Sequence, residues 1–396
     1  MIRNKIFVLL IFAFACQQKA PSIVQLTSPA GNNSEEPYLF SDETGNVFLS
    51  WVERADSSTT LHYSSLSDAG WAEPTVIASG KEWFVNWADY PMLSVNKGKY
   101  MAHFLDKSGE GTFAYDVKLT TSTDGKVWSN PTIIHDDGKQ AEHGFVSLLP
   151  YGDNFLVVWL DGRNTVMEGM ENMDHEGHHG SMSLRAAVVD GSGAKLNEWE
   201  LDNKTCDCCQ TIAVMTADGP AVIYRDRSDD EIRDMSIVRL IDNSWTQPVP
   251  VYSDQWKIAG CPVNGPRADA KGNTLAVAWF TAAENQPQVN VIFSSDNGET
   301  FGQPVRVNSE PTIGRVDVIL LDEHTAVVSW MEGEMIKAMR INNDGSLGDP
   351  IQVAAASEAR SSGFPQMTRS ANNLIFAWTD VEAKTIGTAQ LSLDNF

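Results

Sequence analysis

The stretch "LAVAWFT" (residues 275–281) decides the fold, because close copies of it recur along the whole chain. Each copy is an apolar segment rich in β-branched residues that ends in an aromatic residue, closely followed by a polar one, as is typical of a buried strand. The seven aromatic residues are Trp51, Phe104, Trp159, Tyr224, Trp279, Trp330 and Trp378. Successive copies are 48 to 55 residues apart except for one step of 65, so the chain is a repeat array with one insertion.

Two further segments recur at fixed positions relative to the aromatic strand. A short strand, often begun by proline as in "NGPRADA" (264–270), comes before the aromatic strand, and a proline segment such as "WAEPTVI" (71–77) follows it. Four short strands per repeat, without segments of helical period, predict an all-β protein, a seven-bladed β-propeller over residues 22–396. The spare strand "SIVQLTS" (22–28) is predicted to complete the last blade and close the ring.

A turn motif gives the first resemblance to a known family. "SSDNGETF" (294–301) resembles the Asp-box of sialidase-type, or BNR-repeat, propellers, and "TSTDGKVW" (121–128) is a shifted copy with Thr123 at the Asp position. The resemblance implies a sialidase-like propeller, and because sialidases have six blades, six is the alternative to the seven counted here. We expect Asp296 to accept hydrogen bonds from backbone N–H groups of its own loop, which is a structural role.

The N-terminus predicts export. "MIRNKIFVLLIFAFAC" (1–16) has a basic start and an apolar run too short to cross a bilayer, as in a signal peptide of residues 1–15. Cys16 after Ala15 resembles a lipoprotein signal, so we expect Cys16 to be lipidated and residues 16–21 to form a short tether. The predicted location is the cell envelope, in the periplasm or at the cell surface, with membrane contact only through the lipid.

The charge limits the partners. The chain has 52 acidic and 29 basic residues, a net charge of -23. Such acidity argues against nucleic acid and anionic lipid surfaces as partners. We expect instead a metal ion or an acidic small molecule or glycan; the sequence names no protein partner.

Propeller geometry places the cysteines. The loop that enters a blade and the loop after its aromatic strand lie on one face, the funnel face, where polar clefts are found. Cys206, Cys208 and Cys209 enter blade four and Cys261 enters blade five, so we expect the four to face one another. Four cysteines in an oxidising compartment form either disulfides or a metal site, and the sequence leaves both open.

The one insertion favours metal. It follows the aromatic strand of blade three as "NTVMEGMENMDHEGHHGSM" (164–182), on the same face as the cysteines. Thioether and imidazole groups are copper ligands, so copper is the predicted cofactor. With the four cysteines, the predicted metal ligands are Met167, Met170, Met173, Met182, His175, His178 and His179.

A charged segment beside the cysteines predicts a binding site for acidic ligands. The candidate ligand-binding residues are Arg163, Arg225, Asp226, Arg227 and Asn264. The alternative function is a carbohydrate-active enzyme on acidic glycans. Exo-sialidases need an arginine near the N-terminus that "SEEPYLF" (34–40) lacks. Seven-bladed polysaccharide lyases are a closer architectural match, and they use His and Tyr for proton transfer with Arg neutralising a uronate. The candidate catalytic residues by type are His143, Tyr224, Arg225 and Arg163.

Overall fold

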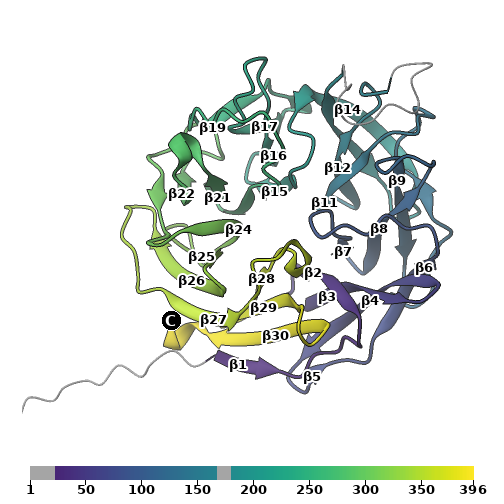
Figure 1. Cartoon of the computed structure of the whole chain (residues 1–396), viewed down its shortest axis with the longest axis horizontal. Coiled ribbons are helices and arrows are strands. Elements are labelled where there is room, and N and C mark those ends of the chain that lie inside the picture. Colours follow the sequence, from purple (N-terminus) through teal and green to yellow (C-terminus); the bar gives the residue numbers. More distant parts are fainter. Residues whose placement is uncertain (1–22, 167–179) are drawn as a thin grey trace, which may run out of the picture.

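Seven antiparallel sheets form a closed ring in the computed structural model, which describes residues 23–166 and 180–396 (Figure 1). The first strand of each blade lies near the central axis and the later strands lie toward the rim. The prediction of seven blades is therefore confirmed, and the six-bladed alternative is wrong.

The strands follow the chain from blade to blade. Blade one contains β2 (Ser34–Ser41), β3 (Val47–Ala55), β4 (Ser58–Ser67), β5 (Gly70–Trp71) and β6 (Thr75–Gly80). Blade two contains β7 (Leu93–Asn96), β8 (Lys99–Lys107), β9 (Tyr115–Ser122) and β10 (Thr132–Ile133). Blade three contains β11 (His143–Tyr151), β12 (Asn154–Asp161), β13 (Met182–Val189) and β14 (Lys195–Thr205). Blade four contains β15 (Ile212–Thr216), β16 (Gly219–Arg225), β17 (Met235–Ile241), β18 (Ser244–Trp245) and β19 (Val249–Tyr252).

The remaining three blades complete the ring. Blade five contains β20 (Arg267–Lys271), β21 (Thr274–Thr281), β22 (Gln288–Ser294) and β23 (Val305–Arg306). Blade six contains β24 (Thr312–Leu320), β25 (Thr325–Glu332), β26 (Met335–Asn342) and β27 (Ile351–Ala355). Blade seven contains β28 (Gln366–Ser370), β29 (Asn373–Asp380), β30 (Thr385–Ser392) and β1 (Ile23–Leu26). The short 3-10 helices among the described residues are η2 (Ala283–Asn285), η3 (Arg360–Ser362) and η4 (Leu393–Asn395).

The repeated aromatic residues pack inside the blades. All seven lie in the second strand of a blade and are buried, at most 6% exposed. A strand whose two faces are both covered by neighbouring blades reads as a continuous apolar run, which is why these strands were visible in the sequence. The core is accordingly spread around the ring between the blades.

Strand β1 ties the two ends of the chain together. It pairs antiparallel with β30, from Ile23 opposite Leu391 to Leu26 opposite Thr388. Blade seven thus takes one strand from the start of the chain and three from its end, and β1 covers the edge of β30.

Aspartate carboxylates join neighbouring blades. Asp89 accepts a hydrogen bond from the Phe145 backbone N–H, and Asp269 accepts one from Leu320, each at 2.7 Å. Each bond connects one blade to the next. Such contacts fix the rotation between blades and hence the positions of the loops on the funnel face.

Aspartate turns close several hairpins. Asp296 accepts from the Thr300 backbone N–H at 2.8 Å and from the Thr300 hydroxyl at 2.6 Å, as expected for a structural turn. In the shifted copy, Asp124 accepts from the backbone N–H groups of Lys126 and Val127. Asp124, and not Thr123 as predicted, therefore stands at the aspartate position of this turn.

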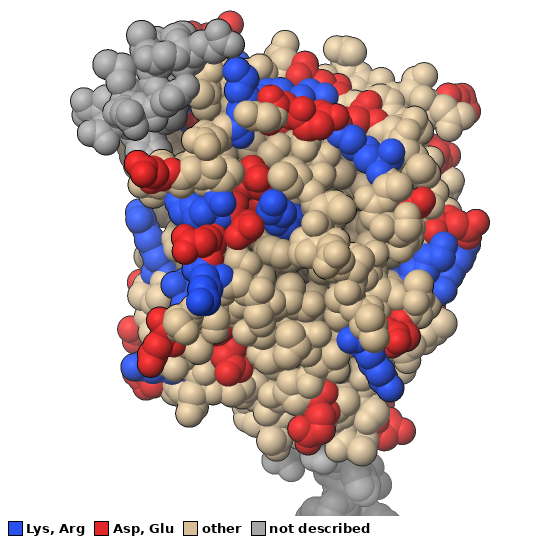
Figure 2. Space-filling model, turned by 90° about the vertical axis from the view of Figure 1, so that its right-hand side faces the viewer, with Lys and Arg blue, Asp and Glu red and all other residues tan. Residues whose placement is uncertain are grey.

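The outer surface carries both signs of charge. Figure 2 shows acidic and basic side chains interspersed on the side in view, without a continuous basic area. Within the described part of the chain, no helix combines the length and the hydropathy that a membrane crossing requires.

Candidate functional site

Three cysteines lie on one turn where the chain passes from blade three to blade four. Strand β14 ends at Thr205, and Cys206 and Cys209 are the first and fourth residues of the turn that follows. A turn brings such residues together. The Cys206 Sγ lies 3.6 Å from the Cys209 Sγ and 3.9 Å from the Cys208 Sγ, and the three sulfurs lie within 4.8 Å of one another.

Blade five adds the fourth cysteine. A short bridge between Ile232 and Lys257 holds the loop of blade four against the segment that leads to Cys261. Cys261 raises the pKa of the Cys208 thiol, and Cys208 lowers that of Cys261, so these two side chains interact. The structure thus brings together Cys206, Cys208 and Cys209, and Cys261 interacts with this group at Cys208.

All four of these thiols are free. A disulfide joins its sulfurs at about 2.05 Å, much less than the 3.6 Å separating Cys206 from Cys209. The structure therefore has no disulfide among these four cysteines. Cys206 and Cys209 are buried, Cys208 is half-buried and Cys261 is exposed, so the cluster opens to solvent on the side of blade five.

Cys206 is the preferred thiolate of the cluster. Burial by itself would raise the pKa of its thiol, but hydrogen bonds from Cys208 and Cys209 and the charges of Arg233 and Arg225 hold that pKa well below its usual value. The Arg233 Nη1 donates to the Cys206 Sγ at 3.2 Å. Hydrogen bonds within the cluster raise the pKa of Cys208, and burial raises that of Cys209, as expected for the S–H donors to a thiolate.

Arg225 is used inside the fold. Its guanidinium donates to the backbone carbonyls of Arg233, Phe280 and Asn264, the last through two nitrogens, and lies 4.9 Å from the Trp256 ring. It is 1% exposed. Asn264 accepts from the Arg315 backbone N–H and is also buried. As placed, neither residue faces a ligand in solvent.

Arg227 and Asp226, two further predicted ligand-binding residues, are engaged by ion pairs and hydrogen bonds within the protein. Arg227 donates to Asp207 at 3.0 Å and to Glu231 at 2.8 Å. The Asp226 carboxylate accepts from the Arg227 backbone N–H and from the Ser236 hydroxyl. These contacts hold the loop after β16 beside the thiols, where it forms the wall of the cluster.

Arg163 belongs to a buried network at the start of blade three. It donates to both carboxylate oxygens of Asp161 at 2.8 Å. His143 is fully buried, with Nε2 2.8 Å from Asp137, and its ring stacks on that of His135 at 3.6 Å. Burial would lower the pKa of His143, but the hydrogen bond to Asp137 and the charge of Asp161 raise it. The network is an internal cluster of ion pairs and hydrogen bonds around the imidazole of His143.

The four candidate catalytic residues do not meet in an open cleft. Tyr224 is fully buried and donates to Asp202, on blade three, at 2.5 Å. Because His143, Arg225 and Tyr224 are all closed off from solvent, only a rearrangement would let them touch a substrate. Their residue types suit proton transfer, but the sequence does not reveal that each side chain is already hydrogen-bonded to another residue of the protein.

A group of carboxyls that is absent from the predicted catalytic residues lies near the thiols. The Tyr115 hydroxyl donates to Glu142 at 2.9 Å and lies 3.5 Å from Asp89. Burial raises the pKa of Asp89 to about 7 and that of Glu142 to about 8. The charges of Asp207 and Cys261 add to the second shift, which shows that Glu142 reaches toward the cluster. Glu142 is thus a protonated acid at neutral pH.

The predicted methionine and histidine ligands lie in a segment of which only the ends are described. Met167, Met170, Met173, His175, His178 and His179 lie outside the described residues, as does Cys16. Met182 is described, is buried in β13, and pairs with Thr205, the residue before Cys206. Its backbone therefore borders the cysteine turn.

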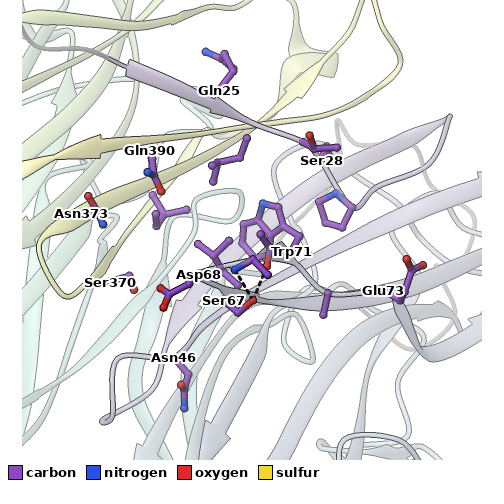
Figure 3. Close-up of a pocket in the computed structure, with 18 of the residues that line it drawn as sticks. Gln25, Ser28, Asn46, Ser67, Asp68, Trp71, Glu73, Ser370, Asn373 and Gln390 are labelled. Atoms are coloured by element: carbon purple, nitrogen blue, oxygen red, sulfur yellow. Dashed lines mark hydrogen bonds between the residues drawn. The ribbon is translucent and has the colours of Figure 1, made fainter.

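A wide cavity of about 1140 Å³ lies elsewhere, between blades one and seven. Figure 3 shows its wall, with Trp71, Asp68, Asn46, Asn373 and Gln390 drawn on strands and turns from the two ends of the chain. Its lining contains no histidine, cysteine, lysine or arginine. The cavity lies on blades other than those of the thiols and is separate from the candidate site.

Comparisons with known proteins support the fold and do not bear on the activity. No protein-family model and no curated protein matches the sequence. Among solved structures, the polysaccharide lyase Uly1 is similar at 10% identity and a TM-score of 0.55, over 91% of this chain and 90% of that one. A protein of unknown function from Dyadobacter fermentans is similar at 13% identity and a TM-score of 0.52, over 80% of this chain and 97% of that one.

A sialidase gives a weaker superposition. The NanB sialidase of Streptococcus pneumoniae has 9% identity and a TM-score of 0.48, over 94% of this chain and 95% of that one. At such identities a likeness shows architecture and says nothing of activity. The chain is a seven-bladed β-propeller that shares its fold with a polysaccharide lyase.

Proposed function

We propose that this propeller binds a soft transition-metal ion, copper, through the thiol cluster of Cys206, Cys208, Cys209 and Cys261. The observation that carries the proposal is that the free thiols of Cys206, Cys208 and Cys209 lie within 4.8 Å of one another on one turn, with the free thiol of Cys261 interacting with Cys208. An ion with metal–sulfur bonds of about 2.3 Å in tetrahedral geometry separates its sulfurs by about 3.8 Å. The observed separations of 3.6 and 3.9 Å already have this size.

Copper is favoured over other metals by the ligands around it. Thiolate and thioether groups select copper(I), and the spacing Cys-x-Cys-Cys differs from the zinc-knuckle spacing. The sequence predicts further copper ligands in the Met/His segment between β12 and β13 of blade three. The proposed role is binding of the ion, or its redox use, at the funnel face.

The test is metal loading of the reduced, exported protein without oxygen. We expect one copper(I) per chain in the wild type and a loss of affinity on the order of 100-fold in Cys206→Ser/Cys209→Ser. Val249→Ser, at an exposed position of the same blade, is the control. Substoichiometric copper in the wild type, or equal copper in the double variant, would contradict the proposal.

We further propose that the chain is a lipoprotein of the cell envelope, anchored through Cys16. The support is the sequence of residues 1–16 described above. Mass spectrometry of the protein from membranes should find an acylated Cys16 as the first residue. Cys16→Ser should move the protein to the soluble envelope fraction, and an unprocessed N-terminus would count against the proposal.

A second function is favoured by Glu142. A half-buried carboxyl with a pKa of about 8 beside a tyrosine hydroxyl is suited to donate a proton, and the fold is shared with a polysaccharide lyase. The second candidate is therefore action on acidic glycans. Release of unsaturated uronates or of sialic acid from a glycan panel, lost in Glu142→Gln, would support it; a panel without turnover would remove it.

A further inference from the structure

The wide cavity between blades one and seven lies away from the funnel face. Its lining includes Asn46, just before β3, and Ser370 and Asn373, on either side of the turn between β28 and β29. Turns between the first and second strands of a blade lie opposite the loops of the funnel face. Further wall comes from residues 25–29, where the chain crosses from β1 at the rim toward β2 near the axis (Figure 1), and from residues 66–74 of blade one.

One aromatic residue stands in the middle of this cavity. Trp71, in β5, is half-buried, and its Nε1 donates to the Thr388 hydroxyl of β30 at 3.2 Å. This bond ties blade one to blade seven and fixes the orientation of the indole ring. Because the only polar atom of the side chain is already bonded, the ring offers a ligand apolar surface. Figure 3 shows Trp71 with Asn373 and Gln390 on one side and Glu73 on the other.

The polar groups around Trp71 are free to bind a ligand. Among residues 23–166 and 180–396, nothing forms a hydrogen bond or an ion pair with the side chains of Asp68, Glu73, Asn373 and Gln390. An amide both donates and accepts, and a carboxylate accepts. Together these groups can therefore satisfy hydroxyl groups, which also donate and accept.

The charge of the lining argues against an acidic ligand. The residues described there include the carboxylates of Asp68 and Glu73 and no lysine, arginine or histidine, so an anion would be repelled and would find no cation to pair with. An aromatic ring among amides suits an uncharged ligand with flat apolar faces and many hydroxyls. Sugars have this chemistry, because the C–H groups of a pyranose ring form an apolar face and the hydroxyls lie around its edge.

The size of the cavity favours several sugar units over one. Its volume of about 1140 Å³ exceeds the roughly 300–1,000 Å³ of ordinary ligand pockets. We propose that this cavity binds a neutral oligosaccharide, with Trp71 stacking on a sugar ring and Asn373 and Gln390 bonding to hydroxyls. The site shares no residue with the thiol cluster, so the proposal goes beyond the function proposed above.

The test is titration calorimetry of the exported protein with neutral hexasaccharides of glucose, xylose, mannose and N-acetylglucosamine. A hexasaccharide of galacturonic acid is the acidic probe, and one of glucosamine is the cationic probe. The variants are Trp71→Leu, which removes the aromatic ring, and Asn373→Ala/Gln390→Ala, which leaves the bond between Trp71 and Thr388 in place. Trp245→Leu is the matched control, because Trp245 occupies the same position in β18 of blade four as Trp71 does in β5.

We expect at least one neutral hexasaccharide to bind, and Trp71→Leu to weaken its binding about tenfold or more. Asn373→Ala/Gln390→Ala should weaken it by about the same factor. Trp245→Leu should leave the affinity unchanged, which separates loss of the ring at this site from a general effect of losing a tryptophan.

Three results would overturn the proposal. The first is no binding of any neutral hexasaccharide, and the second is binding that neither Trp71→Leu nor Asn373→Ala/Gln390→Ala weakens. The third is tighter binding of the acidic or the cationic probe than of the neutral ones, which would assign the cavity to a charged ligand. Copper loading is measured separately, so each of these failures leaves the proposal for the thiols in place.

Discussion

At the scale of single residues, Glu142 couples the funnel face to pH. Burial raises its pKa to about 8 in the folded protein, against 4.5 for an ordinary glutamate. The folded state therefore holds this proton more tightly than the unfolded state does. Its contribution to the free energy of unfolding is full below pH 4.5 and is lost as the pH rises to about 8.

Glu142→Gln should remove this dependence, because glutamine cannot ionise and still accepts the Tyr115 hydrogen bond. We expect the variant to gain about 4 kcal/mol relative to the wild type between pH 4.5 and pH 8. Urea unfolding at the two pH values measures this. Glu73→Gln, at an exposed position, is the control, and a constant difference between Glu142→Gln and the wild type would contradict the pKa assignment.

Single residues also mark the limit of what the sequence could predict about the site. The cysteines could be placed, because their positions before the first strands of two blades follow from the repeat. Arg233 could not, since it lies in a charged segment, "RDRSDDEIRD" (225–234), that resembles a solvated loop. The contact of Arg233 with Cys206 depends on how the loop after β16 folds back onto the cysteine turn. Periodicity carries no information about that folding.

At the scale of elements, the hairpin turns contribute separately to stability. Asp296 binds the Thr300 backbone and side chain and lies on the surface. Asp296→Ala removes these two bonds and the one that the carboxylate accepts from the buried Ser294 hydroxyl at 2.7 Å, so we expect a loss of about 1 kcal/mol in the free energy of unfolding. Guanidinium unfolding measures it, with the exposed Asp349→Ala as the control. A loss no larger than that of the control would show that water replaces the aspartate.

The bonds between blades should matter more than the turns. Asp269 accepts from the Leu320 backbone N–H, which Asp269→Ala would leave unpaired at the contact of blades five and six. We expect a loss of about 1–3 kcal/mol, larger than that of Asp296→Ala in the same assay. The same ranking should appear in amide exchange, with faster exchange at Leu320. Equal losses in the two variants would mean that the blades are held by side-chain packing alone.

At the scale of the whole molecule, the repeat explains why the fold could be predicted. Each blade needs a strand covered on both faces, and that requirement leaves an apolar run ending in an aromatic residue such as Trp279 or Trp330. Seven such runs fixed the number of blades. The enzymatic hypothesis had no comparable support, because burial and pairing of His143 and Tyr224 depend on contacts between blades. Repetition therefore predicts architecture better than it predicts chemistry.

The closure of the ring gives the last prediction. Strand β1 contributes four residue pairs to β30, and without it the β30 edge, including Leu391, would lie open. A chain that starts at Ser28 should therefore unfold at a lower temperature and scatter more light on heating than one that starts at Gln17. The peptide "SIVQLTS" (22–28), added in excess, should bind the open edge and raise the unfolding temperature of the shortened chain. A scrambled peptide of the same composition is the control. Equal stability of the two chains would show that β30 needs no partner, and the ring would then be held by the contacts of blades seven and one alone.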